Sequence, residues 1–127
     1  MVIPQGNTVV SLAPAQTIMA ELADCLKLLL EDGETKQLNL TELHLSEHDL
    51  DELADYLGVG DVRFTLEDEQ ACSLRETAYA GIWWVTCYDQ QHKVQSESIE
   101  VTRFPERLMT SLDDIRRSAV AIRNYQN

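Results

Sequence analysis

The 127-residue sequence has little proline, glycine or cysteine and no long apolar run, and each shortage excludes a class of protein. Three prolines and five glycines exclude a collagen-like or low-complexity chain. Three widely spaced cysteines do not make a disulfide-stapled miniprotein and predict reduced thiols. No apolar stretch reaches the roughly 20 residues of a transmembrane helix, and residues 1–10 lack the pattern of a secretory signal. We therefore expect a cytoplasmic protein that does not insert into a membrane.

Basic residues are also scarce, ten against 22 acidic ones, which gives a net charge of -12. The imbalance lies in residues 1–69, with 15 acidic and 3 basic side chains, whereas residues 70–127 have 7 of each. A polyphosphate competes poorly for such a surface, so we expect no nucleic-acid partner. A basic peptide would suit the acidic half, although acidic side chains also serve solubility alone.

The apolar content of 44% is that of one compact domain. We expect a flexible N-terminal tail over residues 1–12 and a single domain over residues 13–127. Pro14 suits the first turn of a helix. Apolar residues then recur at helical spacing as far as Leu30, and Gly33 suits the position just past the helix end.

A short strand and a second helix are expected next. Residues 36–40 alternate polar and apolar side chains, so the two leucines should face a core from a strand that pairs at a sheet edge. Ser46 and Asp49 have the three-residue spacing of a capping box, which predicts a helix start. Gly58 is expected to end this helix.

The apolar period then changes from helical to two, which predicts four consecutive strands. These strands are expected at residues 62–66, 72–79, 82–88 and 94–103. Ile82–Val85 is apolar at every position, so the strand that contains it should be central and covered on both faces.

A last helix is expected after Pro105, which cannot donate a hydrogen bond to a strand ladder. Ser111 and Asp114 repeat the capping spacing. The element order predicts an α+β fold, a largely antiparallel sheet of four to five strands with three helices packed on it. The expected core face of the last helix is Leu112, Ile115, Ala119 and Ile122.

Familiar catalytic patterns are missing from the sequence, so we expect no enzyme and no cofactor. It has no phosphate-binding glycine loop, no nucleophile elbow and no His-Glu-x-x-His motif. His44 and His48 have a spacing that suits two metal ligands on one helix, but the predicted helix starts between them, at Ser46. Surface histidines are the better interpretation, and no metal site is predicted.

The cysteines have structural interpretations. Cys25 falls on the apolar stripe of the first helix, where a thiol behaves as a small hydrophobe. If the turn pairs Tyr79 with Ile82, Cys72 and Cys87 become diagonal neighbours at roughly 7–8 Å, beyond easy disulfide reach. Two packed thiols are therefore favoured, and a redox or metal-binding pair is the alternative.

Trp83 and Trp84 are adjacent in one expected strand and must point to opposite faces of the sheet. Core packing accounts for one ring, and the other is expected to be more exposed and is a candidate anchor for a partner. Arg75 is expected to form an ion pair across the strands with Glu97 or Glu100.

Three segments together resemble a known family. They are Arg75–Val85 (Arg-Glu-Thr-Ala-Tyr-Ala-Gly-Ile-Trp-Trp-Val), Ser98–Val101 (Ser-Ile-Glu-Val), and Pro105 with Asp113–Ile115. The combination is similar to the C-terminal region of the HupH/HyaF-type hydrogenase expression and formation proteins. The likeness extends over roughly the last two thirds of the chain.

The resemblance implies a chaperone-like accessory factor in nickel–iron hydrogenase maturation, without catalytic residues. Its partners would be the precursor of a hydrogenase subunit, the iron–sulfur small subunit with its twin-arginine leader, and other maturation factors. Longer relatives have additional sequence before this region, and a homodimer is a possible arrangement of this shorter form. Carried over by position, the partner-binding residues would be Arg75, Glu76, Thr77, Tyr79, Gly81, Trp83 and Glu100.

The competing hypothesis is a metal-delivery or thiol-redox protein that uses His44, His48, Cys72 or Cys87. A four-iron cluster needs about four thiolates. Three cysteines cannot supply them, so the sequence favours a protein-binding factor over a cluster carrier.

Overall fold

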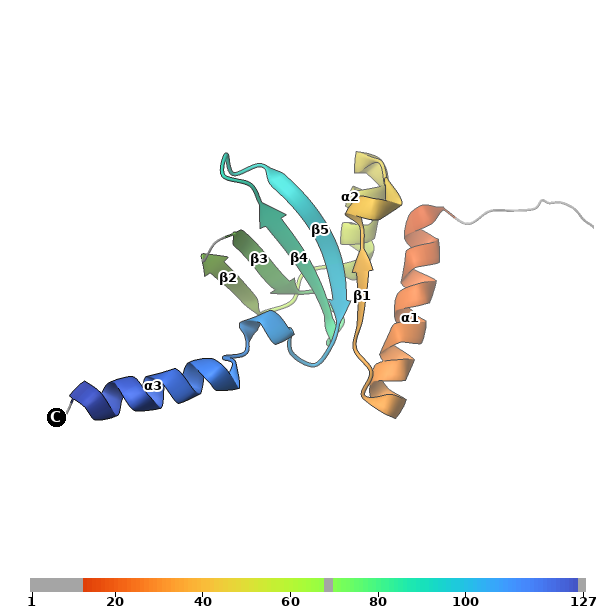
Figure 1. Ribbon diagram of the computed structural model, residues 1–127. Coiled ribbons are helices and arrows are strands. Elements are labelled where there is room, and N and C mark those ends of the chain that lie inside the picture. The colour runs from red at the N-terminus through yellow and green to blue at the C-terminus, as the bar shows by residue number, and fades with distance from the viewer. Residues whose placement is uncertain (1–12, 68–69, 126–127) are drawn as a thin grey trace, which may run out of the picture.

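The computed structural model describes residues 13–67 and 70–125, and they form the predicted α+β fold (Figure 1). The expected tail over residues 1–12 lies outside the described residues. None of the described helices is both long and apolar enough to cross a bilayer. The elements in chain order are α1 Pro14–Asp32, β1 Lys36–Asn39, η1 Thr41–Leu43, α2 Glu47–Leu57, β2 Arg63–Glu67, β3 Ala71–Glu76, β4 Ile82–Tyr88, β5 Val94–Val101, η2 Glu106–Leu108 and α3 Leu112–Tyr125.

The sheet has the strand order β1-β5-β4-β3-β2, and every neighbouring pair is antiparallel. Strands β2 to β5 form the predicted meander, and β1 adds to β5 at one edge, also as predicted. Strand β4 lies in the middle. All four residues of Ile82–Val85 are buried, which confirms that this strand is covered on both faces.

The first face of the sheet carries the main core, under α1 and α2, which lie side by side (Figure 1). Cys25 packs at the margin of this core, as predicted. Burial of these side chains is the main source of stability for the fold. The buried residues are Ala15, Ile18, Leu22, Leu40, Leu53, Leu57, Ile82, Trp84, Ile99 and Val101.

Local signals in the sequence set the ends of both packed helices. Pro14 occupies the first turn of α1, and Gly33 ends it with a left-handed φ of 70°. Ser46 accepts a hydrogen bond from the Asp49 amide, and the Asp49 carboxylate accepts one from the Ser46 amide. This capping box is the predicted start of α2.

The second face of the sheet carries a smaller core, covered in part by the η2 segment. Its buried members are Cys72, Leu74, Val85 and Cys87, and Leu108 of η2 packs against them. The chain therefore closes this face with a short turn after Pro105, which fully buries the proline itself.

Helix α3 forms as predicted but does not pack on the sheet. It extends away from the rest of the fold (Figure 1), and none of its described residues is buried. The expected core face is wrong: Leu112 is 74% exposed and Ile122 is 63% exposed. The η2 segment, which precedes α3 in the chain, is the element that packs against the second face, through Leu108. Its own ion pairs, Arg116 with Asp113 and Arg117 with Asp114, support the isolated helix.

Candidate functional site

Several of the predicted partner-binding residues hold the β3–β4 turn together. The Glu76 carboxylate accepts a hydrogen bond from the Gly81 amide at 3.2 Å. Gly81 has a φ of 93°, which favours glycine. Its carbonyl accepts a hydrogen bond from the Thr102 amide at 2.9 Å, which ties the turn to the end of β5. These contacts give Glu76 and Gly81 a structural task.

Thr77 and Tyr79 complete the same turn. Thr77 is buried, and its hydroxyl oxygen lies 3.2 Å from both the amide nitrogen and the carbonyl oxygen of Tyr79. The Tyr79 ring is 48% exposed, unlike the Trp83 ring, which is 3% exposed. Tyr79 is therefore the member of this turn that presents a large side chain to solvent.

Both tryptophans are buried, so the expectation that one ring is more exposed is wrong. Trp83 lies on the second face, where Phe64 and Phe104 pack against it at ring-centroid distances of 6.2 Å. Its indole nitrogen donates to the Thr102 carbonyl at 3.2 Å. Trp84 lies in the core under the helices. Phe64 of β2 and Phe104, which follows β5 and which the strand pattern does not place, provide the cover over Trp83.

Arg75 does not form the ion pair expected from the sequence. Its guanidinium carbon lies 5.4 Å from the centroid of the Trp84 ring, an arrangement that allows a cation–π interaction. Glu97 accepts a hydrogen bond from the Trp84 indole at 2.8 Å, and Glu100 pairs with Arg107. The observed register places Arg75 directly opposite Trp84, which explains the difference.

Cys72 and Cys87 form a disulfide, which corrects the expectation of two separate thiols. The predicted turn paired Tyr79 with Ile82, but the structure pairs Glu76 with Trp83. This register places the cysteines directly opposite each other, with their Cα atoms 4.1 Å apart. The loop between β3 and β4 is longer than the sequence pattern indicated. The resulting change in register brings Cys72 and Cys87 from diagonal positions to directly opposite positions, where they bond.

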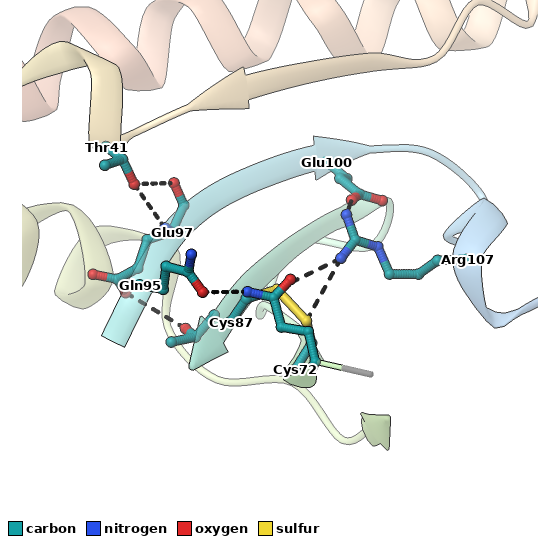
Figure 2. The surroundings of a disulfide bond; sticks show 9 residues. Thr41, Cys72, Cys87, Gln95, Glu97, Glu100 and Arg107 are labelled. Carbon is teal, nitrogen blue, oxygen red and sulfur yellow. Dashed lines mark hydrogen bonds and ion pairs between the residues drawn. A yellow bond between two sulfur atoms is a disulfide. The ribbon is translucent and has the colours of Figure 1, made fainter. Parts of the chain in front are cut away.

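Arg107 covers this disulfide from the η2 segment (Figure 2). Its Nη1 lies 3.6 Å from the Cys87 sulfur and 3.8 Å from the Cys72 sulfur. Its Nη2 forms an ion pair with Glu100 at 3.2 Å. The sequence analysis missed Arg107, because a single arginine after a proline carries no local signal of a long-range contact.

An open groove of about 970 Å³ lies beside this cluster, between the start of β1, the end of β5 and the chain that leads into α3. Lys36 lies on its wall and donates a hydrogen bond to the Glu34 carboxylate, which raises the pKa of Lys36 and keeps it charged. Of the predicted binding residues, Glu100 lines the groove. The full lining is Thr35, Lys36, Gln37, Glu100, Thr102, Phe104, Glu106, Arg107, Met109, Thr110 and Ser111.

The two histidines of the alternative hypothesis lie on the surface. His44 follows η1 with a left-handed φ of 52°, and His48 lies in the first turn of α2. Within residues 13–67 and 70–125, no three His, Cys, Asp or Glu side chains are placed to hold a metal ion together.

A family model described as the HupH hydrogenase expression protein, C-terminal conserved region, matches residues 12–127. The chain belongs to this HupH family. A solved structure titled hydrogenase expression protein HupH from Thiobacillus denitrificans matches it with a TM-score of 0.83 and 33% identity, over 93% of this chain and 100% of that one. The resemblance found in the sequence is confirmed.

Two curated proteins are similar over most of this chain. The hydrogenase expression/formation protein HupH of Rhodobacter capsulatus is 33% identical over 120 residues, 94% of this chain and 42% of that protein. The protein HoxQ of Azotobacter vinelandii, of the same description, is 30% identical over 114 residues, 88% of this chain and 40% of that protein. The chain thus spans about two fifths of these relatives' length.

Proposed function

We propose that this chain is a non-catalytic accessory factor in nickel–iron hydrogenase maturation that binds the precursor of a hydrogenase subunit in the cytoplasm. The observation that carries the proposal is the family match over residues 12–127. The partner we propose is the iron–sulfur small subunit before its export, together with other maturation factors. The names of the relatives, hydrogenase expression/formation proteins, support this role.

The acidic helices support binding of a basic segment of that precursor. Together, α1 and α2 contain nine acidic residues and one lysine. Glu47, Asp51 and Asp55 recur every four residues on one exposed face of α2, where like charges repel each other. Within the described residues none of the three forms an ion pair. A basic partner would relieve this repulsion. We therefore propose that Glu47, Asp51 and Asp55, the acidic stripe of α2, make the first contact with the basic segment of the precursor.

Several charged and hydroxyl groups of the groove already have partners in the fold, which supports binding more than catalysis. Glu100 pairs with Arg107, Lys36 pairs with Glu34, and the Ser111 hydroxyl accepts from the Asp114 amide. Phe104 and Met109 leave 41% and 62% of their surfaces exposed at its rim. A groove with apolar rim residues and paired charges suits an extended peptide segment.

The test measures binding of a purified small-subunit precursor, with its leader, to this chain by titration calorimetry at low and high salt. The variant Asp51→Asn/Asp55→Asn removes two charges of the stripe. We expect about fivefold weaker binding at low salt, since each exposed pair contributes up to about 1 kcal/mol. High salt should abolish the difference, because exposed charges are screened.

The matched control is Asp61→Asn/Glu67→Gln, which removes two exposed acidic residues from the β2 side of the fold. It should bind as the original chain does. If both variants bind the precursor equally weakly, net charge explains the loss of affinity, and the acidic stripe has no specific role in binding. A precursor that fails to bind the original chain at low salt would overturn the proposed function itself.

The homodimer expected from the sequence is a proposal of the same kind. Sedimentation equilibrium over a hundredfold range of protein concentration tests it directly. A mass that stays at 14.4 kDa throughout would exclude the dimer and leave the binding proposal unaffected.

A further inference from the structure

The Cys72–Cys87 pair is built into two neighbouring central strands of the sheet. Both cysteines are nearly buried, with 4% and 5% of their surfaces exposed. They stand opposite each other in β3 and β4, with their Cα atoms 4.1 Å apart. The strand register therefore keeps the sulfurs close to each other whether or not they are bonded.

Arg107 is the charged group that contacts both sulfurs. One guanidinium nitrogen faces them at 3.6 and 3.8 Å, while the other is held by Glu100 at 3.2 Å. The Arg107 side chain is 37% exposed, so the group that contacts the sulfurs is itself accessible to solvent.

We propose that Cys72 and Cys87 form a reversible thiol–disulfide site, which dithiol reductants open and which Arg107 stabilises in its thiolate form. A positive charge beside a sulfur favours the thiolate over the thiol. The thiolate is also the group that leaves when the disulfide is attacked. Arg107 is therefore placed to assist cleavage at either sulfur.

The exchange balances as two successive displacements. A thiolate of the dithiol attacks one sulfur, breaks the Cys72–Cys87 bond and forms a mixed disulfide, and the other cysteine leaves as a thiolate. The second thiol of the reductant then displaces the first cysteine and closes its own disulfide. Two electrons and two protons pass from the dithiol to the cysteine pair.

Reduction also changes the adjacent groove, because Arg107 and Glu100 both line it. A new thiolate would compete with Glu100 for the guanidinium. The Glu100 carboxylate would then be freer to meet a cationic group of a ligand. The site thus connects the redox state of the pair to the charge of the groove.

The test uses the full chain with Cys25→Ala, which leaves only the two thiols of interest. The protein is equilibrated in buffers of reduced and oxidised dithiothreitol, quenched with acid, alkylated and weighed by mass spectrometry. We expect full and reversible conversion between zero and two free thiols, with unchanged near-ultraviolet circular dichroism. Thiols that never pair at the oxidising end, or a pair that opens only when the protein unfolds, would overturn the proposal.

The role of Arg107 is tested in the reduced protein by thiolate absorbance at 240 nm against pH. Arg107→Gln should lower the thiolate fraction at a fixed pH about tenfold, which corresponds to one pKa unit. Arg107→Lys keeps the charge and should stay close to the original titration. The control Arg116→Gln removes an equal charge from α3, away from the sheet. If the folded Arg107→Gln protein titrates as the original does, Arg107 does not stabilise the thiolate. If Arg107→Gln does not fold, a tenfold loss of the thiolate fraction in Arg107→Lys would lead to the same conclusion, because that variant keeps the charge.

Discussion

Trp83 and Trp84 are neighbours in β4, yet each ring belongs to a different core, because successive strand residues point to opposite faces of the sheet. Trp84 joins the helical core, and Trp83 packs with aromatic side chains on the other face. Each indole also donates a hydrogen bond, Trp84 to Glu97 in the middle of β5 and Trp83 to Thr102 just after that strand. On both faces of the sheet, this pair therefore links β4 to β5 or to the segment that follows it.

Replacing either ring by phenylalanine should destabilise the fold. Trp83→Phe leaves the Thr102 carbonyl without its indole donor, and Trp84→Phe does the same to Glu97. Thr102 is buried, and a buried acceptor left unpaired costs about 2 kcal/mol of unfolding free energy. Glu97 is half-buried and still accepts a hydrogen bond from the Thr86 hydroxyl, so Trp84→Phe should cost less, about 1 kcal/mol. Urea denaturation followed by circular dichroism measures the loss. Tyr79→Phe, on an exposed ring of the same turn, should change stability by less than about 0.5 kcal/mol. Equal values for all three variants would contradict the two-core arrangement.

The two serine caps should differ in their effect on stability. Ser46→Ala removes the capping box of α2, a helix that packs on the core, and should cost about 1 kcal/mol. Ser111→Ala removes the corresponding hydrogen bond to Asp114 at the start of α3. Because α3 stands apart from the core, we expect the global unfolding midpoint to stay the same while helical content falls. Hydrogen exchange of the α3 amides would report the local fraying.

Apolar residues of α3 should tolerate truncation that α1 does not. Leu22→Ala opens a cavity in the core and should cost about 3 kcal/mol, since Leu22 is 1% exposed. Ile122→Ala removes a side chain that is 63% exposed and should leave the unfolding free energy nearly unchanged. Parallel chemical denaturation of both variants at low protein concentration checks this. A large loss in Ile122→Ala would show that α3 is packed in solution.

The Cys25 thiol should ionise only at high pH. Burial raises its pKa above the ordinary value, and the charge of Glu21 raises it further. The stability that this group contributes is thus fully present below the pKa of the unfolded chain and is lost as pH rises through the folded pKa. The rate of Cys25 alkylation against pH should have a midpoint above that of a short cysteine peptide. Glu21→Gln should move the midpoint down, whereas Glu67→Gln, far along the chain in β2, should not.

Local patterns in the sequence were sufficient for the elements and for the family. The capping box at Ser46, the left-handed position of Gly33 and the apolar run in β4 each depend on a few neighbouring residues, and all are confirmed. The same holds for the short segments that carry the family resemblance, and the family match over residues 12–127 confirms it. Short-range sterics and hydrogen bonding decide these features, so residues that are close together in the sequence are sufficient to predict them.

The candidate site depended on contacts between distant residues, so the sequence alone could not place it. The Cys72–Cys87 bond follows from the register of β3 and β4, which the length of one turn decides. Arg107 reaches those sulfurs across 35 and 20 positions of sequence. The amphipathic pattern of α3 predicted a helix correctly, but whether its apolar face is buried depends on what already covers the sheet. The sequence by itself determined the elements, their order and the family, whereas only the tertiary structure decided which of them meet, because burial and register depend on the whole fold at once.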